Sequence, residues 1–302
     1  MAHAGDRIVK VIVPYGAGGD LDTLARIFSE KMGAALNENW IVENSPGGNG
    51  RVGTNRVLQA KADGTTLLFS SSIHYIAPLV TRNLPYDAIA DFVPIGPVVR
   101  TPMVMMASTA LVKANTAGEV IAAMKAEPGK YTFAHPGLGA SGHIAGLVFM
   151  DAAKVKGMLV PYNGTAQAIT DVMAGSVSFV FMTPILAAHH ASSSRLKPIL
   201  TTASERLGGA LKDVPTSAEV GLPALTTRNV YGFWGPKGMP AEEVARLSNA
   251  LRKVSELPDV KRRLVPQGMQ PTWEAPEVFA EKIDAEFRSD RDMLAKAGVK
   301  PE

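Results

Sequence analysis

Strand and helix patterns alternate along almost the whole chain. Residues 8–14 are typical of a buried strand, because positions 8, 9 and 11–13 are β-branched and only Lys10 interrupts them before the proline. A glycine-rich turn follows, and the apolar residues between Leu21 and Met32 then fall on one face of a helix. Strands at 40–43 and 65–69, with a helix at 52–62 between them, continue the pattern. Such alternation predicts an α/β fold with a mainly parallel sheet.

The alternation is interrupted between residues 84 and 107, where prolines are frequent. Within this region, 98–106 is a long apolar run, and we expect it to be one strand that crosses from a first lobe to a second. The pattern then restarts, with helices predicted at 116–125, 144–153 and 166–174 and strands at 131–134, 158–161, 177–182 and 196–201.

A second crossing is expected at 228–236, where four aromatic or β-branched residues cluster, and the rest of the chain has helical patterns at 241–254 and 276–297. The first lobe is therefore expected to be discontinuous. It would consist of residues 5–100 and 229–302, with the second lobe, 101–228, inserted between them.

Composition limits the possible functions. The chain has 302 residues, of which 46% are hydrophobic and 20% charged, as in an ordinary soluble globular protein of about two domains. The net charge of +3 is small and there is no run of Lys or Arg, so we expect no nucleic-acid partner. The absence of cysteine excludes disulfides, thiolate zinc sites and cysteine nucleophiles. No apolar run approaches the ~18 residues that span a membrane.

The first residues carry a possible export signal. Ala2-His3-Ala4 has the small-x-small form that remains at a signal-peptidase cut, here preceded by an added Met1. A cloning scar or an ordinary tail explains the same residues, so both interpretations stay open.

Two segments share one design, in which a strand leads through a glycine-rich loop into a helix. They are 14–22 and 135–142. Glycines let a backbone approach a ligand closely, and a helix start offers unpaired N–H groups and the positive end of the helix dipole. Each loop therefore suits an anionic group, and together they predict a ligand held between two lobes. The alternative is that both are simply tight turns.

Several other chemistries fit poorly. Leu21 stands where the third glycine of GxGxxG would be, and Met124 where a P-loop begins, so we expect no nucleotide cofactor. His189-His190 lacks the carboxylates or spacing of a metal site. Ser141 lies near His143, but the sequence is not GxSxG, and a serine at a helix start is more often a cap or a ligand donor.

Two acidic residues lie at the start of the first helix. Asp22 is expected to cap it. Asp20 is harder to explain, because a carboxylate beside an anion site repels the ligand unless it points away or meets a cation.

The chain resembles the Bug (TctC-like) family, the solute-binding proteins of tripartite tricarboxylate transporters, from about Ile8 to about Val299. The resemblance rests on an ordered set of short motifs rather than on any single one. They are Val13-Pro14-Tyr15 with Gly18-Gly19 and Asp22, then Val42 to Gly50, Ala62 to Leu68, Leu84 to Asp87 with Asp91-Phe92, Ser141 to Gly146, Val160 to Gly164, and Asp213 to Thr216 with Glu219 to Pro223.

The resemblance implies a two-lobed α/β periplasmic binding protein (type II, Venus-flytrap) with two crossing strands. It implies no catalysis and no cofactor or metal. The protein would be an exported monomer, periplasmic after removal of a signal peptide, that binds a small organic acid and delivers it to membrane permease subunits. The residues that the resemblance places at the ligand are Tyr15, Gly16, Ala17, Gly18, Gly19, Ser70, Ser71 and Ser72 in lobe 1 and Gly137, Gly139, Ala140, Ser141 and Tyr162 in lobe 2.

Departures from the family pattern bear on specificity. Gly16-Ala17 replaces two common prolines, Asp20 replaces a small hydroxyl residue, and Met182-Thr183 replaces a region that often carries an acidic residue able to hold an ammonium group. The last difference argues against amino acids, whereas Asp20 argues for a ligand with a cation. We expect a dicarboxylate, with aromatic ones among the candidates, whose apolar body is walled by Tyr15, His74, His135, Tyr162 and Met182.

Two other functions stay open. One is a hydrolase or transferase that uses Ser141 and His143. The other is a sensor that presents the closed complex to a membrane receptor. A cytosolic effector domain is disfavoured because no helix-turn-helix pattern precedes the first strand.

Overall fold

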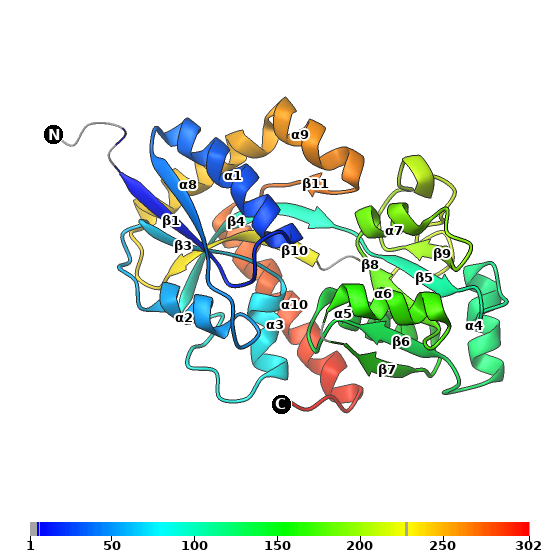
Figure 1. Ribbon diagram of the computed structural model, residues 1–302. Helices are drawn as coiled ribbons and strands as arrows, with labels where there is room; N and C mark the ends of the chain where they lie inside the picture. Colours follow the sequence, from blue (N-terminus) through cyan, green and yellow to red (C-terminus); the bar gives the residue numbers. More distant parts are fainter. Residues whose placement is uncertain (1–4, 6, 163, 227–228, 302) are drawn as a thin grey trace.

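The computed structural model describes residues 5, 7–162, 164–226 and 229–301, and these form two β-sheets with helices packed on them (Figure 1). Lobe 1 is built on the larger sheet. Strands β1, β2 and β3 run parallel in it, while β10 is antiparallel to both β3 and β4. The order across the sheet is β11 (Gln270–Pro271), β4 (Phe92–Thr101), β10 (Asn229–Pro236), β3 (Thr66–Ser71), β1 (Ile8–Val13) and β2 (Asn39–Asn44).

Lobe 2 is built on the second sheet. Strands β6, β7 and β8 are parallel, and β5 pairs antiparallel with β8 and β9. The order is β7 (Met158–Pro161), β6 (Thr132–His135), β8 (Phe179–Met182), β5 (Val104–Ser108) and β9 (Leu196–Thr201).

The helices of lobe 1 cover its sheet with apolar faces. Helix α1 (Asp20–Leu36) buries Leu24, Phe28 and Met32 at helical spacing, as the sequence pattern predicts. The others are α2 (Arg51–Leu58), α3 (Ile73–Val80), α8 (Ala241–Glu256), α9 (Pro258–Leu264) and α10 (Pro276–Lys296), with a 3₁₀ turn at Val265–Gln267.

The helices of lobe 2 differ in how deeply they lie. Helix α5 (Ser141–Ala153) is buried along most of its length, because its residues are small or apolar on nearly every face. The other helices are α4 (Ala117–Ala126), α6 (Thr165–Ala174) and α7 (Pro184–His190), with a 3₁₀ turn at Gly209–Leu211.

The first crossing between the sheets differs from the prediction. We expected one strand over 98–106, but β4 ends at Thr101 and β5 begins at Val104, in the other sheet. Pro102 has no N–H to donate to a ladder, so the strand breaks there. Strand β4 instead starts at Phe92 and runs through two prolines, which its position beside the two-residue β11 allows.

Met103 is the second of the two residues between the strands, and lobe 2 holds it firmly. Its N–H donates to the Thr202 hydroxyl oxygen at 2.9 Å, and its carbonyl accepts from the Thr202 N–H at 2.9 Å and from the Thr201 hydroxyl at 3.1 Å. The second crossing enters lobe 1 at β10, whose first residue is Asn229; Arg228, which we included in that crossing, lies outside the described residues.

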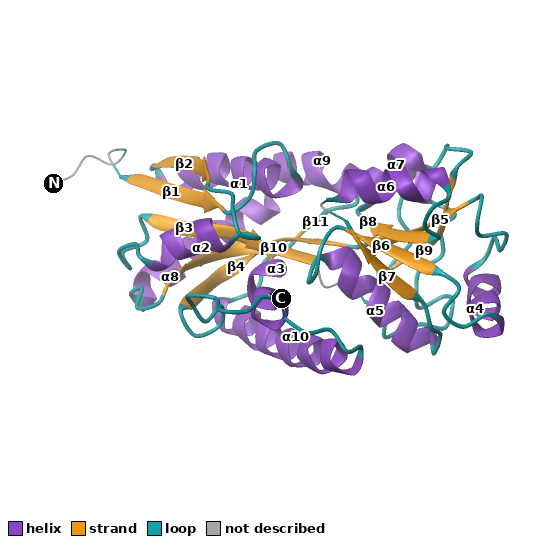
Figure 2. Ribbon diagram, turned by 60° about the horizontal axis from the view of Figure 1, so that its bottom comes forward, coloured by secondary structure: helices purple, strands orange, loops and turns teal. Residues whose placement is uncertain are grey.

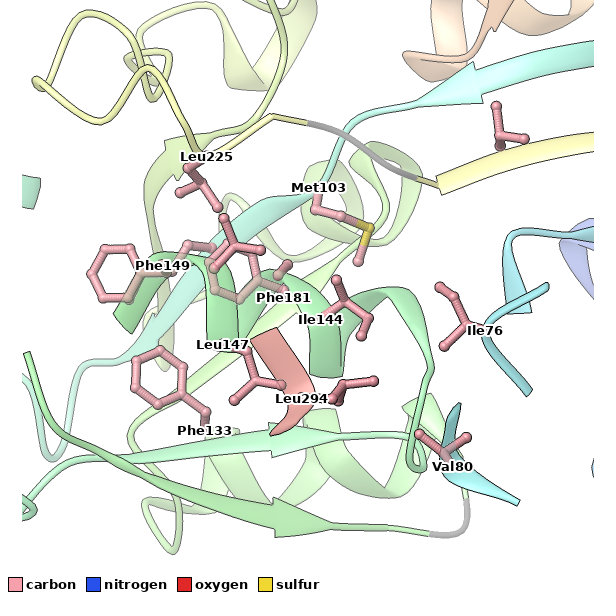
Figure 3. Packing of buried hydrophobic residues seen from close by; sticks show 14 of the residues in the cluster. Ile76, Val80, Met103, Phe133, Ile144, Leu147, Phe149, Phe181, Leu225 and Leu294 are labelled. Atoms are coloured by element: carbon pink, nitrogen blue, oxygen red, sulfur yellow. The ribbon is translucent and has the colours of Figure 1, made fainter. Parts of the chain in front are cut away.

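The lobes also touch through helices outside the crossing segments. One cluster of buried apolar side chains joins Ile76 and Val80 of α3 and Leu294 of α10 to Ile144 and Leu147 of α5 (Figure 3). Helix α10 runs beside the lobe 1 sheet toward α5 (Figure 2), and Lys296 Nζ lies 2.5 Å from Asp151 Oδ1 there. The two crossings are therefore supplemented by a packed contact that the sequence did not indicate.

Candidate ligand-binding site

A cavity of about 330 Å³ lies between the two lobes, at the ends of their strands. Lobe 1 contributes the loop after β1, the end of β3 and the start of β10. Lobe 2 contributes the loops that lead into three of its helices. The lining residues are Tyr15, Asp20, Leu21, Ser71, Ile73, Met103, Pro136, Ala140, Ser141, Gly142, Gly164, Thr165, Phe181, Met182, Thr183, Leu186, Asn229 and Tyr231.

The starts of four helices of eight or more residues converge on this cavity. The first residues of α1, α3, α5 and α6 are Asp20, Ile73, Ser141 and Thr165, and all four line it. None of these helices has a side-chain hydrogen bond at its N-cap. Helices α2, α8 and α10 do not line the cavity and also lack side-chain caps, whereas α4, likewise outside it, has a complete capping box. It is therefore the convergence of four helix starts, rather than the missing caps, that brings several unpaired N–H groups to one cavity.

The lobe 1 loop before α1 is held by a carboxylate that does not line the cavity. Asp22 Oδ2 accepts a hydrogen bond from the Gly18 N–H at 3.0 Å, and Arg26 donates to the same carboxylate. The bond from Arg26 is the largest cause that lowers the pKa of Asp22, so this group is ionised near neutral pH. Asp22 therefore stabilises the turn, but it does not cap the helix as predicted: it is the third residue of α1, and the N-cap is Gly19, which has no side-chain cap.

Asp20 is the carboxylate that does line the cavity, and burial raises its pKa. Two tyrosines share its wall. Burial raises the pKa of Tyr231, with a smaller contribution from Asp20, and burial also raises the pKa of Tyr15. Both phenols are therefore neutral near pH 7. Among the described lining residues there is no Lys, Arg or His, so an anionic ligand would meet N–H and O–H donors rather than cations.

The lobe 2 wall carries hydroxyls and small residues. Ser141, Thr165 and Thr183 lie in it, and Thr183 Oγ1 is a buried oxygen without a hydrogen-bond partner among the described residues. Gly142 lets α5 approach β8 closely, since a Cβ there would lie 2.9 Å from the Phe181 carbonyl oxygen. The glycine thus places the start of α5 directly against the end of β8.

Two buried histidines support the loop before α5. The Gly139 N–H donates to His143 Nδ1 at 3.2 Å, His135 Nδ1 lies 3.0 Å from the Gly137 carbonyl oxygen, and the two ring centroids are 4.5 Å apart. Burial, followed by the neighbouring His135, lowers the pKa of His143 to about 3. A neutral His143 can accept the hydrogen bond from the Gly139 N–H, and this bond ties the loop to the first turn of α5.

The structure brings together seven of the eighteen residues that the sequence proposed for ligand contact. They come from both glycine loops, from the end of β3 and from the segment before α7. These seven are Tyr15, Asp20, Ser71, Ala140, Ser141, Met182 and Thr183.

The other proposed residues surround the cavity without lining it. Gly16, Ala17, Gly18 and Gly19 are exposed on the loop before α1, and Ser70 is buried in β3. Ser72 lines a second cavity of about 20 Å³, which shares Met103, Ser141 and Asn229 with the main one. His135 and Gly137 belong to the support of the loop before α5. Gly139 faces α3, where a Cβ would lie 3.0 Å from Val80 Cγ2.

Besides His135, two more of the predicted aromatic walls lie outside the cavity lining. His74 is buried in lobe 1, with its ring centroid 4.8 Å from that of Phe92 and 5.2 Å from that of Trp234. It lies on α3, which begins directly after the serine loop and carries the ring away from the cavity lining. Tyr162 donates its hydroxyl to Asp171 Oδ2 at 2.8 Å, which ties it to α6.

Sequence reasoning missed several lining residues. Gly164-Thr165 could have been found, because it repeats the strand, glycine and helix-start design of the other two loops. Ile73, Met103, Phe181, Asn229 and Tyr231 carried no local signal, since their place depends on how the two lobes meet. Among the described residues, no group of three or more His, Asp or Glu side chains is arranged to hold a metal ion.

Comparison with known proteins decides the family. The model of the TctC family, the tripartite tricarboxylate transporter family receptor, matches residues 24–298. The chain belongs to this family. The predicted relationship is confirmed, and TctC-family proteins are solute-binding receptors.

Individual TctC-family relatives agree along their length. The chain is 31% identical to the UPF0065 protein of the tcbD-tcbE intergenic region of Pseudomonas sp. strain P51, over 96% of this chain and 86% of that protein. The structure of the periplasmic binding protein BugD matches with a TM-score of 0.79 and 30% identity, covering 98% of this chain and 99% of BugD. The structure of MatC from Rhodopseudomonas palustris with bound malate matches with a TM-score of 0.77 and 27% identity, covering 95% and 99%. The predicted two-lobed fold is confirmed by these matches.

Proposed function

We propose that the chain is an extracytoplasmic solute-binding protein that captures a small organic dicarboxylate between its lobes for a tripartite tricarboxylate-type transporter. The observation that carries this proposal is the convergence of four helix starts on one cavity between the lobes. Unpaired N–H groups and helix dipoles favour negative charge, and carboxylates are among the small anions that suit such donors.

The size of the cavity agrees with a small ligand. About 330 Å³ lies at the lower end of the range for small-molecule sites, which is about 300–1,000 Å³. Donors at both lobes suit a molecule with a polar group at each end, and malate, bound by MatC, is such a molecule. Tyr15 and Tyr231 add two aromatic rings to the lobe 1 side of the lining, which keeps an aromatic dicarboxylate among the candidates.

Binding between the lobes suggests how the transporter distinguishes the protein with ligand from the protein without it. A ligand that touches both lobes favours their closure, and the permease subunits of the transporter would recognise the closed form. We place the lobe boundaries near residues 100 and 228, because the sheet changes at Pro102 and again before Asn229.

We further propose a periplasmic location after removal of a signal peptide, and a monomer. BugD is itself a periplasmic binding protein. Among the described residues, no helix is both long and apolar enough to cross a membrane.

The enzyme alternative gains little from the site. His143 Nδ1 already accepts the Gly139 N–H, and burial keeps the pKa of this histidine far below that of a general base working near neutrality. Ser141 begins a helix, where its hydroxyl and backbone are placed to donate to a ligand. Delivery and sensing use the same closed complex, so capture of permease subunits from membrane fractions is the measurement that separates them.

A thermal-shift screen tests the ligand class. Monocarboxylates, dicarboxylates, tricarboxylates and amino acids are compared at equal concentration. A ligand at about 100 times its Kd stabilises the folded protein by about 2.7 kcal/mol, a shift of a few degrees for a protein of this size. We expect dicarboxylates to give the largest shift, and Ser141→Ala to reduce it without any turnover in either protein. A shift from amino acids alone would contradict the proposed class, and product formed by wild type but not by Ser141→Ala would establish an enzyme.

A further inference from the structure

Asp20 is the one feature of the cavity that the proposed function leaves unexplained. It is the first residue of α1, so it lies at a helix start, where a bound anion would otherwise be expected. It also lines the cavity, where a dicarboxylate would bring further negative charge. The inference below rests on the proposed function, because it concerns how the same site accepts its ligand.

Among the residues that the structure describes, the ionisable groups around Asp20 offer it no cation. On its own helix, Arg26 is already paired with Asp22. From the loop after β1 and from β10, the facing groups are Tyr15 and Tyr231, whose raised pKa values keep them neutral.

The facing wall of lobe 2 is also without charge among the described residues. It presents Ser141, Thr165 and Thr183, and the nearby His135 and His143 have lowered pKa values and do not line the cavity. Asp20 is therefore a carboxylate whose described neighbours in the cavity are uncharged donors.

We propose that Asp20 is a specificity-determining residue that binds one carboxylate of the dicarboxylate as a neutral acid, so that ligand binding takes up one proton. In the complex, the Asp20 carboxyl donates its O–H to a ligand carboxylate oxygen. No covalent bond changes. The proton comes from solvent, and the two carboxyl groups together carry one negative charge instead of two.

This arrangement follows from the cost of the alternative. Two ionised carboxylates in one partly desolvated site repel each other strongly, and one of them then takes a proton. Burial has already moved Asp20 in that direction in the protein without ligand. The second carboxylate of the ligand would be free to accept N–H and O–H donors from the starts of α5 and α6 in lobe 2.

The proposal predicts a defined pH dependence. If one proton is taken up, affinity falls about tenfold for each pH unit, or about a hundredfold between pH 6 and pH 8. Asp20→Asn keeps a neutral side chain of similar shape with N–H donors. It should bind dicarboxylates at least ~10-fold more tightly than wild type near pH 8, with little dependence on pH.

Calorimetry with matched probes tests this. Succinate, 4-aminobutyrate and butyrate form a four-carbon series, and adipate, 6-aminohexanoate and hexanoate a six-carbon series. Each is titrated into wild type, Asp20→Asn and Glu30→Gln at several pH values, in buffers of different ionisation heat so that proton uptake is counted directly. Glu30 is an exposed acid on the same helix, and its variant should behave as wild type. The Asp20→Asn protein also reports the ligand's own titration.

The outcomes separate the inference from the proposed function. Uptake of about one proton with a dicarboxylate, lost in Asp20→Asn, supports the inference. Dicarboxylate binding without proton uptake overturns it while the proposed function stands. Preference of wild type for the amino acids of the two series, lost in Asp20→Asn, also overturns it and makes Asp20 the partner of an ammonium group. If no carboxylate binds wild type or Asp20→Asn, the proposed function fails, and the inference with it.

Discussion

The two walls of the cavity are built alike but charged differently. In each lobe a strand leads through a glycine-containing loop into a helix whose first residue faces the cavity. That first residue is Asp20 in lobe 1, whereas it is Ser141 in α5 and Thr165 in α6 of lobe 2. The same position in one repeated design therefore carries an acid on one side and a hydroxyl on the other.

This difference separates two tasks. The hydroxyl-bearing starts of lobe 2 suit any carboxylate, because they add donors to the helix N–H groups already present. The acid of lobe 1 adds a condition, since a ligand group beside it must be a cation, a donor or a partner for a proton. General affinity for anions is thus expected to come from lobe 2, and discrimination among them from lobe 1.

The largest predicted effect comes from disrupting the close packing of α5 against β8 in the lobe 2 wall. Gly142→Ala would place a Cβ 2.9 Å from the Phe181 carbonyl oxygen, so α5 must move away from β8. We expect a loss of about 3 kcal/mol in the free energy of unfolding, as for an overpacked core, together with the loss of ligand binding. Denaturant unfolding and calorimetry measure the two effects.

A matched control lies one turn further along the same helix. At Gly146 the nearest atom to a new Cβ would be Leu159 Cδ2 at 3.5 Å, which is ordinary contact. Gly146→Ala should therefore stabilise α5 by about 0.5–1 kcal/mol and leave binding intact. Equal behaviour of the two variants would show that the close contact of α5 with β8 does not position the lobe 2 wall.

A smaller effect is expected from the buried histidines, one behind each wall. Burial lowers the pKa of His143, in lobe 2, and of His74, in lobe 1, to about 3. The unfolded chain protonates each near its ordinary value of about 6.5. The contribution of these histidines to the free energy of unfolding is therefore fully present above pH 6.5. It falls by up to about 1.4 kcal/mol per pH unit for each histidine as the pH drops toward 3.

The variant His143→Asn tests the lobe 2 contribution. An Asn oxygen can lie near the place of Nδ1 and accept the Gly139 N–H, but it does not titrate in this range. Between about pH 6 and 4, the free energy of unfolding of this variant should depend less steeply on pH than that of wild type. The difference in slope should correspond to up to one proton fewer taken up on unfolding. His189→Asn, at an exposed position, is the control and should leave the slope unchanged. An unchanged slope in His143→Asn would mean that His143 is protonated in the folded protein.

Local patterns predicted most of the fold because they depend on neighbours in sequence. The face of α1 and the strand at β1 follow from apolar spacing alone. The break at Pro102 was missed because an apolar run looks continuous even where a strand must leave its sheet. Helix α3 was missed because its apolar residues lie beside a serine-rich loop that we did not extend into a helix.

The site was predicted in part for a related reason. Asp20 and Ser141 follow from the position of a helix start, which glycine loops reveal. His74 was misplaced because its neighbour in sequence, the serine loop, faces the cavity while its own helix turns the ring into the core. Tyr231 and Asn229 came from a distant strand, and only the pairing of β10 with β3 brings them to the cavity.

The smallest predicted effect concerns how the two walls are held at their angle. Lys296 of α10 and Asp151 of α5 form an ion pair between the lobes, but their side chains are 69% and 48% exposed. An exposed pair of this kind contributes about 0–1 kcal/mol and is screened by salt. Lys296→Ala should therefore change the free energy of unfolding by less than about 0.5 kcal/mol and the ligand Kd by less than about twofold.

A double-mutant cycle of Lys296→Ala with Asp151→Asn, measured at low and at high salt, checks this expectation. If the coupling is small, the lobes are oriented by the apolar contact of α3 and α10 with α5, and the surface pair only accompanies it. A coupling above about 1 kcal/mol, or a shift in Kd that follows it, would instead make the pair part of the hinge. Ligand affinity would then depend on the Lys296–Asp151 ion pair, which lies outside the cavity lining, as well as on Asp20.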